Sequence, residues 1–223
     1  MTVESVFFDL DGTLLDRDAS LAAFVQDQYE YCAALQVVEK ATFVERFIEL
    51  DNHGSVWKDK VYQQLIAEYA IRNVEWPQLL HDYISNFHKY CIGYPNLVQM
   101  LTWLKGNHIK IALVSNGFGQ FQYDNFKALQ IAPFFHEVFI SEWEGLRKPD
   151  PAIFNRALAQ LGVTADRALF VGDHPEHDVR ASRTVGMTAI WKRNDRRETV
   201  AEADAVIDDL AELIDIVRPL LNE

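Results

Sequence analysis

Cysteine is scarce in this chain, which has only Cys32 and Cys91 among its 223 residues. Two cysteines are too few for a disulfide framework and lack the spacing of a metal site, so we expect buried, reduced thiols. Long apolar runs are missing too, because no stretch approaches the roughly 20 residues that cross a bilayer. The first residues also lack the basic and apolar regions of a signal peptide. We therefore expect a cytoplasmic protein without a membrane partner.

An excess of positive charge is missing as well. Lys and Arg total 21 against 33 Asp and Glu, which gives a formal net charge of -12. Binding to nucleic acid or to an anionic membrane depends on a positive field, so this balance argues against both partners. The one basic cluster, residues 192–197, is interrupted by Asp195, and we interpret it as a solvated loop. An anionic ligand would need local attraction from a metal ion, a lysine or a helix N-terminus.

The chain begins with an apolar strand that stops at two carboxylates. Residues 6–8 (Val-Phe-Phe) lead directly into residues 9–13, Asp-Leu-Asp-Gly-Thr. In an open α/β sheet, ligands bind in the crevice outside the carboxyl ends of the strands. A polar turn is the simpler alternative, because Asp and Gly are common turn formers. Residues further along the chain decide between the two interpretations.

The next segment is helical. From about Ala19 to Cys91 the apolar residues are spaced by three and four, which predicts four consecutive helices and a small helical bundle. The first strand must rejoin the sheet that follows, so the helices form an insertion. We therefore predict a core domain of residues 1–14 and 94–223 and an all-helical cap domain of residues 15–93.

After the helical segment, strands and helices alternate. The pattern predicts strands at residues 110–114, 137–140, 168–171, 188–191 and 205–207. Between the second and third of these, Asp150 precedes Pro151 as a helix N-cap, and Gly162 ends that helix. This alternation is typical of a three-layer α/β fold, with a mostly parallel sheet covered by helices on both faces.

Polar residues also follow two later strands. Ser115 and Asn116 end the strand at 110–114, Asp173 follows the strand at 168–171, and Asp178 lies five residues further on. Lys148 precedes the capped helix. Each could be an ordinary turn or surface residue alone, but parallel strands would bring all of them to one edge of the sheet.

These four pieces, in this order, resemble the haloacid dehalogenase superfamily of phosphotransferases. The matches are D-x-D-G-T at 9–13, the strand-end Ser115, Lys148, and G-D-x-x-x-x-D at 172–178. The insertion after the first motif resembles the helical cap of that family. The resemblance covers the whole chain, and it implies a Rossmann-like fold with strand order 3-2-1-4-5 and dependence on Mg²⁺.

The resemblance also implies roles for the carboxylates. Asp9 suits the nucleophile that forms an aspartyl-phosphate, and Asp11 would protonate the leaving oxygen and then deprotonate the attacking water. Mutual repulsion of these acids calls for cations, since two charges 4 Å apart interact by about 4 kcal/mol at an effective dielectric of about 20. Asp9, the main-chain carbonyl of Asp11 and Asp173 would fit Mg²⁺, with Asp178 holding a bound water.

The remaining residues of the motifs would bind or orient. Ser115 offers a hydroxyl to a phosphoryl oxygen, backbone amides near Asn116 add donors, and Lys148 adds a point charge. Thr13 is expected to orient Asp11 by a hydrogen bond. The histidines at 174 and 177 have metal-like spacing, but we interpret them as solvated loop residues.

The motifs predict a Mg²⁺-dependent phosphomonoesterase that acts on a small phosphorylated metabolite. A sugar phosphomutase would share every catalytic residue, and a non-catalytic binding protein could retain the scaffold. A 2-haloacid dehalogenase, by the resemblance, lacks an aspartate at the position of Asp11. In the helical segment, His53 and Lys58 could meet the substrate's leaving group, with an ordinary solvated loop as the alternative. Nothing in the sequence chooses among phosphoglycolate, nucleoside monophosphates and sugar phosphates.

Overall fold

The computed structural model describes residues 2–193 and 202–221. Its contacts divide the chain into two compact units, Met1–Asp16 with Gly93–Glu223 and Arg17–Ile92, which we call the core unit and the helical unit. The divisions follow Asp16 and precede Gly93, whereas the predicted boundaries follow residue 14 and precede residue 94.

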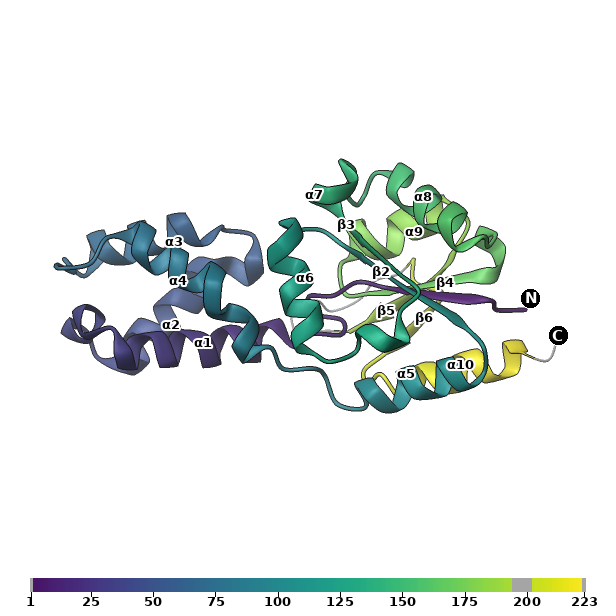
Figure 1. Cartoon of the computed structure of the whole chain (residues 1–223), viewed down its shortest axis with the longest axis horizontal. Coiled ribbons are helices and arrows are strands. Elements are labelled where there is room, and N and C mark those ends of the chain that lie inside the picture. The colour runs from purple at the N-terminus through teal and green to yellow at the C-terminus, as the bar shows by residue number, and fades with distance from the viewer. Residues whose placement is uncertain (1, 194–201, 222–223) are drawn as a thin grey trace. The chain divides into compact units, whose positions relative to one another are not determined.

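Within its described residues, the core unit contains a six-stranded parallel sheet in the order β3-β2-β1-β4-β5-β6 (Figure 1). The strands are β1 (Ser5–Phe8), β2 (Lys110–Ser115), β3 (Glu137–Ile140), β4 (Ala168–Gly172), β5 (Thr188–Lys192) and β6 (Ala205–Ile207). The α/β class and the order of the first five strands are thereby confirmed.

Helices cover both faces of this sheet. They are α5 (Leu97–Gly106), α6 (Gly119–Ala128), α7 (Ser141–Glu144), α8 (Pro151–Leu161), α9 (Ala181–Thr184) and α10 (Glu212–Val217). Helices α5 and α10 lie together on one face, and α8 and α9 lie together on the other (Figure 1). A parallel sheet covered in this way explains why its central strands are almost continuously apolar.

One row of side chains shows how the sheet and α8 form the core. Phe7 is in register with Ala112 on β2 and with Phe170 on β4. Ile153 and Phe154 of α8 belong to the same buried cluster, and the rings of Phe154 and Phe170 are 5.1 Å apart. Full burial of each large apolar side chain contributes about 1.5–3 kcal/mol, so this cluster anchors the helix that follows Lys148.

The ends of α8 are as the sequence predicts. The side chain of Asp150 accepts a hydrogen bond from Ala152 N at 2.9 Å, and Pro151 occupies the first helical position. Gly162 ends the helix with a φ of 63°, a left-handed conformation that glycine adopts without a steric penalty.

The helical unit contains α1 (Arg17–Tyr31), α2 (Lys40–Asp51), α3 (Lys58–Glu68) and α4 (Trp76–Asn86). The buried stripe of α1 includes Gln28, which interrupts an otherwise apolar pattern. Gln28 is satisfied by hydrogen bonds, because it donates to Leu79 O and to Asp82 and accepts from the Tyr62 hydroxyl. Both cysteines are reduced thiols but only half buried, since each lies in a connecting segment outside the α-helices.

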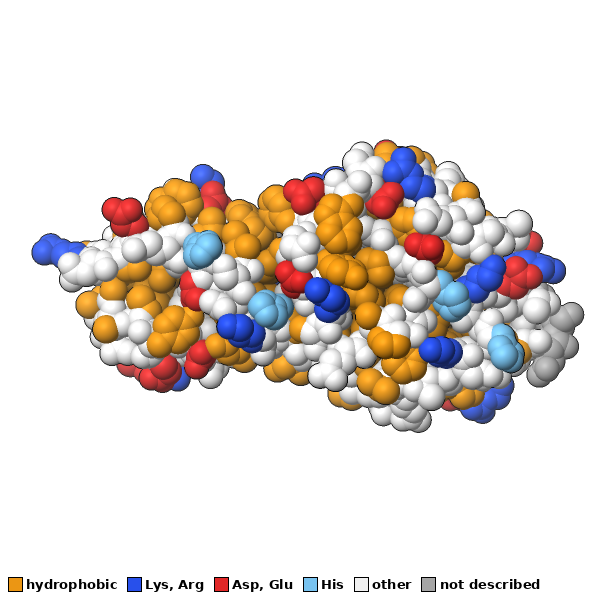
Figure 2. Space-filling view, viewed as in Figure 1, with side chains coloured by type: hydrophobic (Ala, Val, Ile, Leu, Met, Phe, Trp, Pro, Cys, Tyr) orange, Lys and Arg blue, Asp and Glu red, His pale blue; other side chains and the backbone are white. Residues whose placement is uncertain are grey.

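The basic cluster differs in part from its interpretation as a solvated loop. Lys192 is the last residue of β5 and is buried, with its ammonium 4.6 Å from the centre of the Tyr94 ring. Arg193 is exposed, and residues 194–197 lie outside the described residues. On the face seen in Figure 2, blue and red side chains are interspersed rather than gathered into one basic patch. None of the helices in the described parts is long and apolar enough to cross a bilayer.

Candidate active site

The sheet register places three of the predicted motifs at one edge. Phe8, the last residue of β1, is paired with Leu113 of β2 and with Val171 of β4. Asp9 and Asp173 therefore follow neighbouring strands at nearly the same level, with Ser115 at the end of β2. The convergence expected from parallel strands is present.

Lys148 connects two of the acids directly. Its Nζ donates to Asp9 Oδ1 and to Asp178 Oδ1, each at 2.7 Å. The three residues are only 2%, 7% and 1% exposed, respectively, so the ion pairs are shielded from water. The second oxygen of Asp178 accepts from His174 N at 2.9 Å, which fixes this carboxylate from both sides.

Burial changes the titration of this group of residues. It raises the pKa of the Asp9 carboxyl to about 7, and the nearby Lys148 ammonium offsets part of the rise while Asp178 adds to it. Burial alone would lower the pKa of Lys148, but Asp178 and Asp9 outweigh it and raise the pKa above its ordinary value. Lys148 therefore stays charged, whereas an ionised Asp9 needs further positive charge nearby.

Two motif glycines make room for the acids. A Cβ on Gly12 would lie 2.5 Å from Asp173 Oδ2, and a Cβ on Gly172 would lie 2.4 Å from the Cβ of Asp178. Both distances are shorter than any real contact of a Cβ atom. The glycines of D-x-D-G-T and G-D-x-x-x-x-D are thus required by close approach to carboxylates, and Gly12 also has a φ of 79°.

The acidic cluster fits a divalent cation. Asp9, Asp173 and Asp178 each offer a carboxylate oxygen, and these oxygens all lie within 4.8 Å of one another. Hard oxygen donors are the ligands that Mg²⁺ prefers. Three ionised carboxylates this close together repel one another, and a divalent cation would reduce that repulsion.

The side chain of Asn116 binds the backbone of Lys148. Its Nδ2 donates to Lys148 O at 2.8 Å, and its Oδ1 accepts from Lys148 N at 2.9 Å. The backbone amide of the adjacent Gly117 donates to Ser141 Oγ at 3.0 Å. The Asn116 side chain therefore positions Lys148, because the loop before α8 returns alongside the end of β2.

Asp11 is held by a residue that the sequence analysis missed. Nε2 of Gln122, on α6, donates to Asp11 Oδ2 and to Ser115 Oγ, each at 2.8 Å. Gln122 is 3% exposed although it is polar. The only hint in the sequence was a glutamine in the helix that follows a motif strand. Its two acceptors belong to the first motif and to β2, so the sequence of α6 alone does not predict them.

Thr13 does not form the hydrogen bond to Asp11 that we expected. Its Oγ1 is buried and has no hydrogen-bond partner among the described residues. The cause is a turn at Gly12. Gly12 has a positive φ, and the backbone N–H of Thr13 donates to Leu10 O at 3.2 Å. The chain is therefore not extended between Asp11 and Thr13.

The two loop histidines serve the local backbone. Nδ1 of His174 accepts from the backbone N–H groups of Glu176 and His177, which caps the π-helical segment Pro175–Arg180. The rings of His174 and His177 stack with centroids 3.9 Å apart. Neither histidine belongs to the described cluster that could hold a metal ion, and His174 instead fixes the segment that carries Asp178.

In the helical unit, Lys58 and His53 have different surroundings. Lys58 is buried, and its Nζ contacts Asp51, which also forms a two-point ion pair with Arg17 at 2.9 Å. A solvated loop is therefore the wrong interpretation for Lys58. Burial opposes ionisation of Asp51, but Arg17 and Lys58 outweigh it and hold the pKa of Asp51 below its ordinary value. His53 is exposed, with a φ of 55°.

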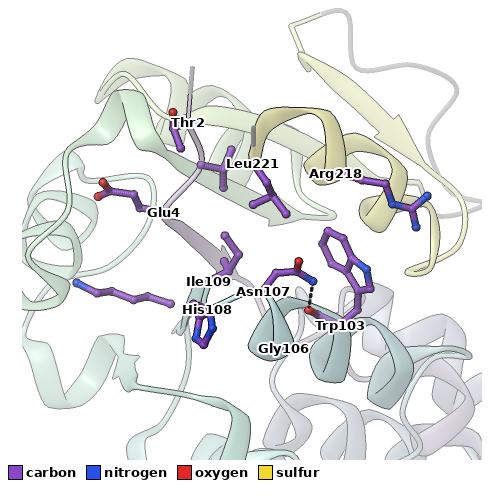
Figure 3. A pocket seen from close by; sticks show the side chains of 11 residues that line it. Thr2, Glu4, Trp103, Gly106, Asn107, His108, Ile109, Arg218 and Leu221 are labelled. Carbon is purple, nitrogen blue, oxygen red and sulfur yellow. Dashed lines mark hydrogen bonds between the residues drawn. The ribbon is translucent and has the colours of Figure 1, made fainter. Parts of the chain in front are cut away.

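A pocket of about 780 Å³ lies at the amino ends of β1 and β2 (Figure 3). Residues 2–4 and 106–110, together with Trp103, Arg218 and Leu221, line it. Two of its basic side chains are engaged, since Arg218 lies over the Trp103 ring at 5.8 Å and Lys110 Nζ donates to Leu161 O at 2.7 Å. No motif residue lines this pocket, so we assign it no part in the chemistry of the site.

Comparison with known proteins places this geometry in a family. The model of haloacid dehalogenase-like hydrolases matches residues 6–192. The chain is 32% identical to a glyceraldehyde 3-phosphate phosphatase of Methanopyrus kandleri, over 99% of this chain and 100% of that protein. It resembles the crystal structure of a HAD phosphatase from Thermococcus onnurineus, with a TM-score of 0.69, 25% identity, and 96% and 98% of the two chains covered. It also resembles a 2-haloacid dehalogenase from Pseudomonas syringae, with a TM-score of 0.66, 26% identity, and 98% and 99% covered. The chain belongs to the haloacid dehalogenase-like hydrolase family and is an enzyme of that family, as its ordered motifs predict.

Proposed function

We propose that the enzyme is a Mg²⁺-dependent phosphomonoesterase that hydrolyses a small phosphorylated metabolite through an aspartyl-phosphate on Asp9. The observation that carries this proposal is the second carboxylate, Asp11, which lies two residues after Asp9 and is held by Gln122. A dehalogenase, by the family resemblance, has no aspartate at this position. The fold alone does not separate the two activities, because solved structures of both kinds resemble it.

The two carboxyl groups divide the chemistry. A carboxylate oxygen of Asp9 bonds to phosphorus as the ester P–O bond breaks, and Asp11 gives its proton to the departing oxygen. Asp11 then takes a proton from a water molecule, whose oxygen attacks phosphorus and breaks the bond to Asp9. The products are an alcohol and inorganic phosphate, and both aspartates return to their initial protonation states.

Charge and donors near Asp9 support this chemistry. Lys148 contacts Asp9 at 2.7 Å and supplies a permanent positive charge beside the entering phosphoryl group. The Ser115 hydroxyl accepts from Gln122 and can donate its own hydrogen to a phosphoryl oxygen. Both groups would act on charge that is spread over the phosphoryl oxygens during transfer.

We assign Asp9, Asp173 and the main-chain carbonyl of Asp11 to hold Mg²⁺, with Asp178 reaching it through water. The assignment is supported by the three carboxylates, whose oxygens lie within 4.8 Å of one another and repel one another when ionised. Bound Mg²⁺ supplies positive charge that neutralises phosphoryl oxygens and keeps a neighbouring carboxylate ionised. That contribution suits Asp9, whose pKa is raised by burial.

The test is phosphate release from a panel of phosphomonoesters, with Mg²⁺ and with an EDTA control. Glyceraldehyde 3-phosphate, which names the Methanopyrus relative, leads the panel, followed by phosphoglycolate, nucleoside monophosphates and sugar phosphates. We expect release that requires Mg²⁺ and is abolished in Asp9→Asn. Full phosphate release by Asp9→Asn would refute the mechanism. Metal-independent chloride release from 2-chloropropionate would instead indicate a dehalogenase, and an isomerised sugar phosphate a phosphomutase.

A further inference from the structure

Gln122 bridges the two halves of the site. Its Nε2 lies 2.8 Å from Asp11 Oδ2, 2.8 Å from Ser115 Oγ and 3.3 Å from Asn116 O. These acceptors come from the first motif and from the end of β2, and the donor comes from α6. One buried amide therefore connects the general acid and base assigned above to the hydroxyl assigned to the phosphoryl group.

We propose that Gln122 is a positioning residue for phosphoryl transfer, which fixes the orientation of Asp11 and of the Ser115 hydroxyl. This inference rests on the proposed function, because it assigns Gln122 a part in the same reaction. Gln122 itself need not touch the substrate. Its effect would be transmitted through the two groups that receive its hydrogen bonds.

The orientation of the amide follows from its partners. Asn116 O is a backbone carbonyl and can only accept, so the nitrogen end of the Gln122 amide must face it. The same nitrogen then carries the hydrogens that reach Asp11 and Ser115. With two hydrogens for three acceptors, the two contacts at 2.8 Å are the principal bonds and the contact at 3.3 Å is shared.

This arrangement selects the active oxygen of Asp11. In a protonated carboxyl group the carbonyl oxygen is a better acceptor than the hydroxyl oxygen, so a donor on Oδ2 favours the acid form that carries its proton on Oδ1. Gln122 thereby determines which oxygen gives a proton to the leaving group. Without the amide, the carboxyl group could rotate and present either oxygen.

The same logic applies to Ser115. A hydroxyl group has one hydrogen and two lone pairs, and one lone pair accepts the bond from Gln122. The Ser115 hydrogen is then directed away from Gln122, toward an acceptor such as a phosphoryl oxygen. Gly117 makes room for this contact, because a Cβ there would lie 2.5 Å from the Cγ of Gln122.

The leaving group provides the sharpest test. Alkyl phosphates need a proton on the departing oxygen, whereas p-nitrophenyl phosphate releases a stable anion without one. The ratio kcat/KM reports the steps up to formation of the phosphoenzyme, which isolates the acid role of Asp11. We expect Gln122→Leu to reduce kcat/KM by roughly 100-fold for the best alkyl phosphate and by under about tenfold for p-nitrophenyl phosphate.

Gln120→Leu is the matched control, since Gln120 is an exposed glutamine on the same helix that bonds to Asp124. It should keep wild-type kcat/KM for both substrates. If Gln122→Leu does not fold, the near-isosteric Gln122→Glu serves in its place, because it also removes the donor. Equal losses for both substrates in a variant with wild-type Tm would overturn the proposal.

A double-variant cycle with Asp11→Asn gives a second readout. If Gln122 acts through Asp11, adding Gln122→Leu to Asp11→Asn should lower kcat/KM for the alkyl phosphate by under about threefold, the share left to Ser115. A full further loss of roughly 100-fold would contradict the proposal. An inactive wild-type enzyme over the whole panel would instead count against the proposed function, so the two failures are distinguishable.

Discussion

Replacing Lys148 by methionine removes the ammonium that Asp9 and Asp178 share and keeps most of the side-chain volume. Both contacts are 2.7 Å long, and the two carboxylates are 7% and 1% exposed, so water cannot take the place of the ammonium. Removal of one partner from a buried ion pair costs about 3–5 kcal/mol. We expect Lys148→Met to lower the free energy of unfolding by this amount in EDTA.

Thermal unfolding followed by circular dichroism measures this loss. For a chain of this size, about 3–5 kcal/mol corresponds to a fall in Tm of roughly 6–20 °C. The fall should be smaller with saturating Mg²⁺, because a divalent cation compensates the same carboxylates. Adding Asp178→Asn removes one unpaired charge and should restore part of the Tm. A change of less than about 2 °C in EDTA would refute the view that Lys148 stabilises these acids.

Three further substitutions test other features of the structure. Gly172→Ala places a Cβ 2.4 Å from that of Asp178, so we expect the free energy of unfolding to fall by about 1–3 kcal/mol and turnover to be impaired. The control Gly106→Ala, with open space around it, should keep both stability and phosphate release. Because the pKa of Asp51 is lowered, its ion pairs stabilise the fold above about pH 4 and are lost as the pH falls further. The free energy of unfolding of Asp51→Asn in urea should therefore depend less on pH, between about 6 and 3, than that of wild type. Asp150→Ala removes the N-cap of α8 and should cost about 1 kcal/mol in the same urea assay, and an unchanged midpoint would contradict the capping role.

The sequence predicted those parts of the site that depend on strand direction. Parallel strands bring their carboxyl ends together, so the proximity of Asp9, Ser115 and Asp173 follows once the alternating pattern is recognised. The helix that begins after Asp150 was equally readable, because its signals are local. For the same reason the strand bounds differ from the predicted ones by one residue at most.

Side-chain partners could not be predicted, because they depend on contacts between distant segments. Gln122 reaches Asp11 across 111 positions of the chain, and Lys58 is buried because Asp51 approaches it from the preceding helix. The expected hydrogen bond from Thr13 to Asp11 is absent, because side chains alternate only in an extended segment and the turn at Gly12 interrupts that alternation. Periodicity gives the face on which a residue lies, but not the group that it meets there.

The two hydrogen bonds between Asn116 and the backbone of Lys148 have a consequence for substrate binding. A side-chain amide offers the same donor and acceptor as a peptide group. Just beyond β2, the Asn116 side chain therefore pairs with the backbone of Lys148 as a neighbouring strand would. The backbone of a loop lysine is thereby held by two hydrogen bonds. The entropy cost of ordering its backbone falls on folding rather than on binding. An incoming anion meets a cation that is already in place.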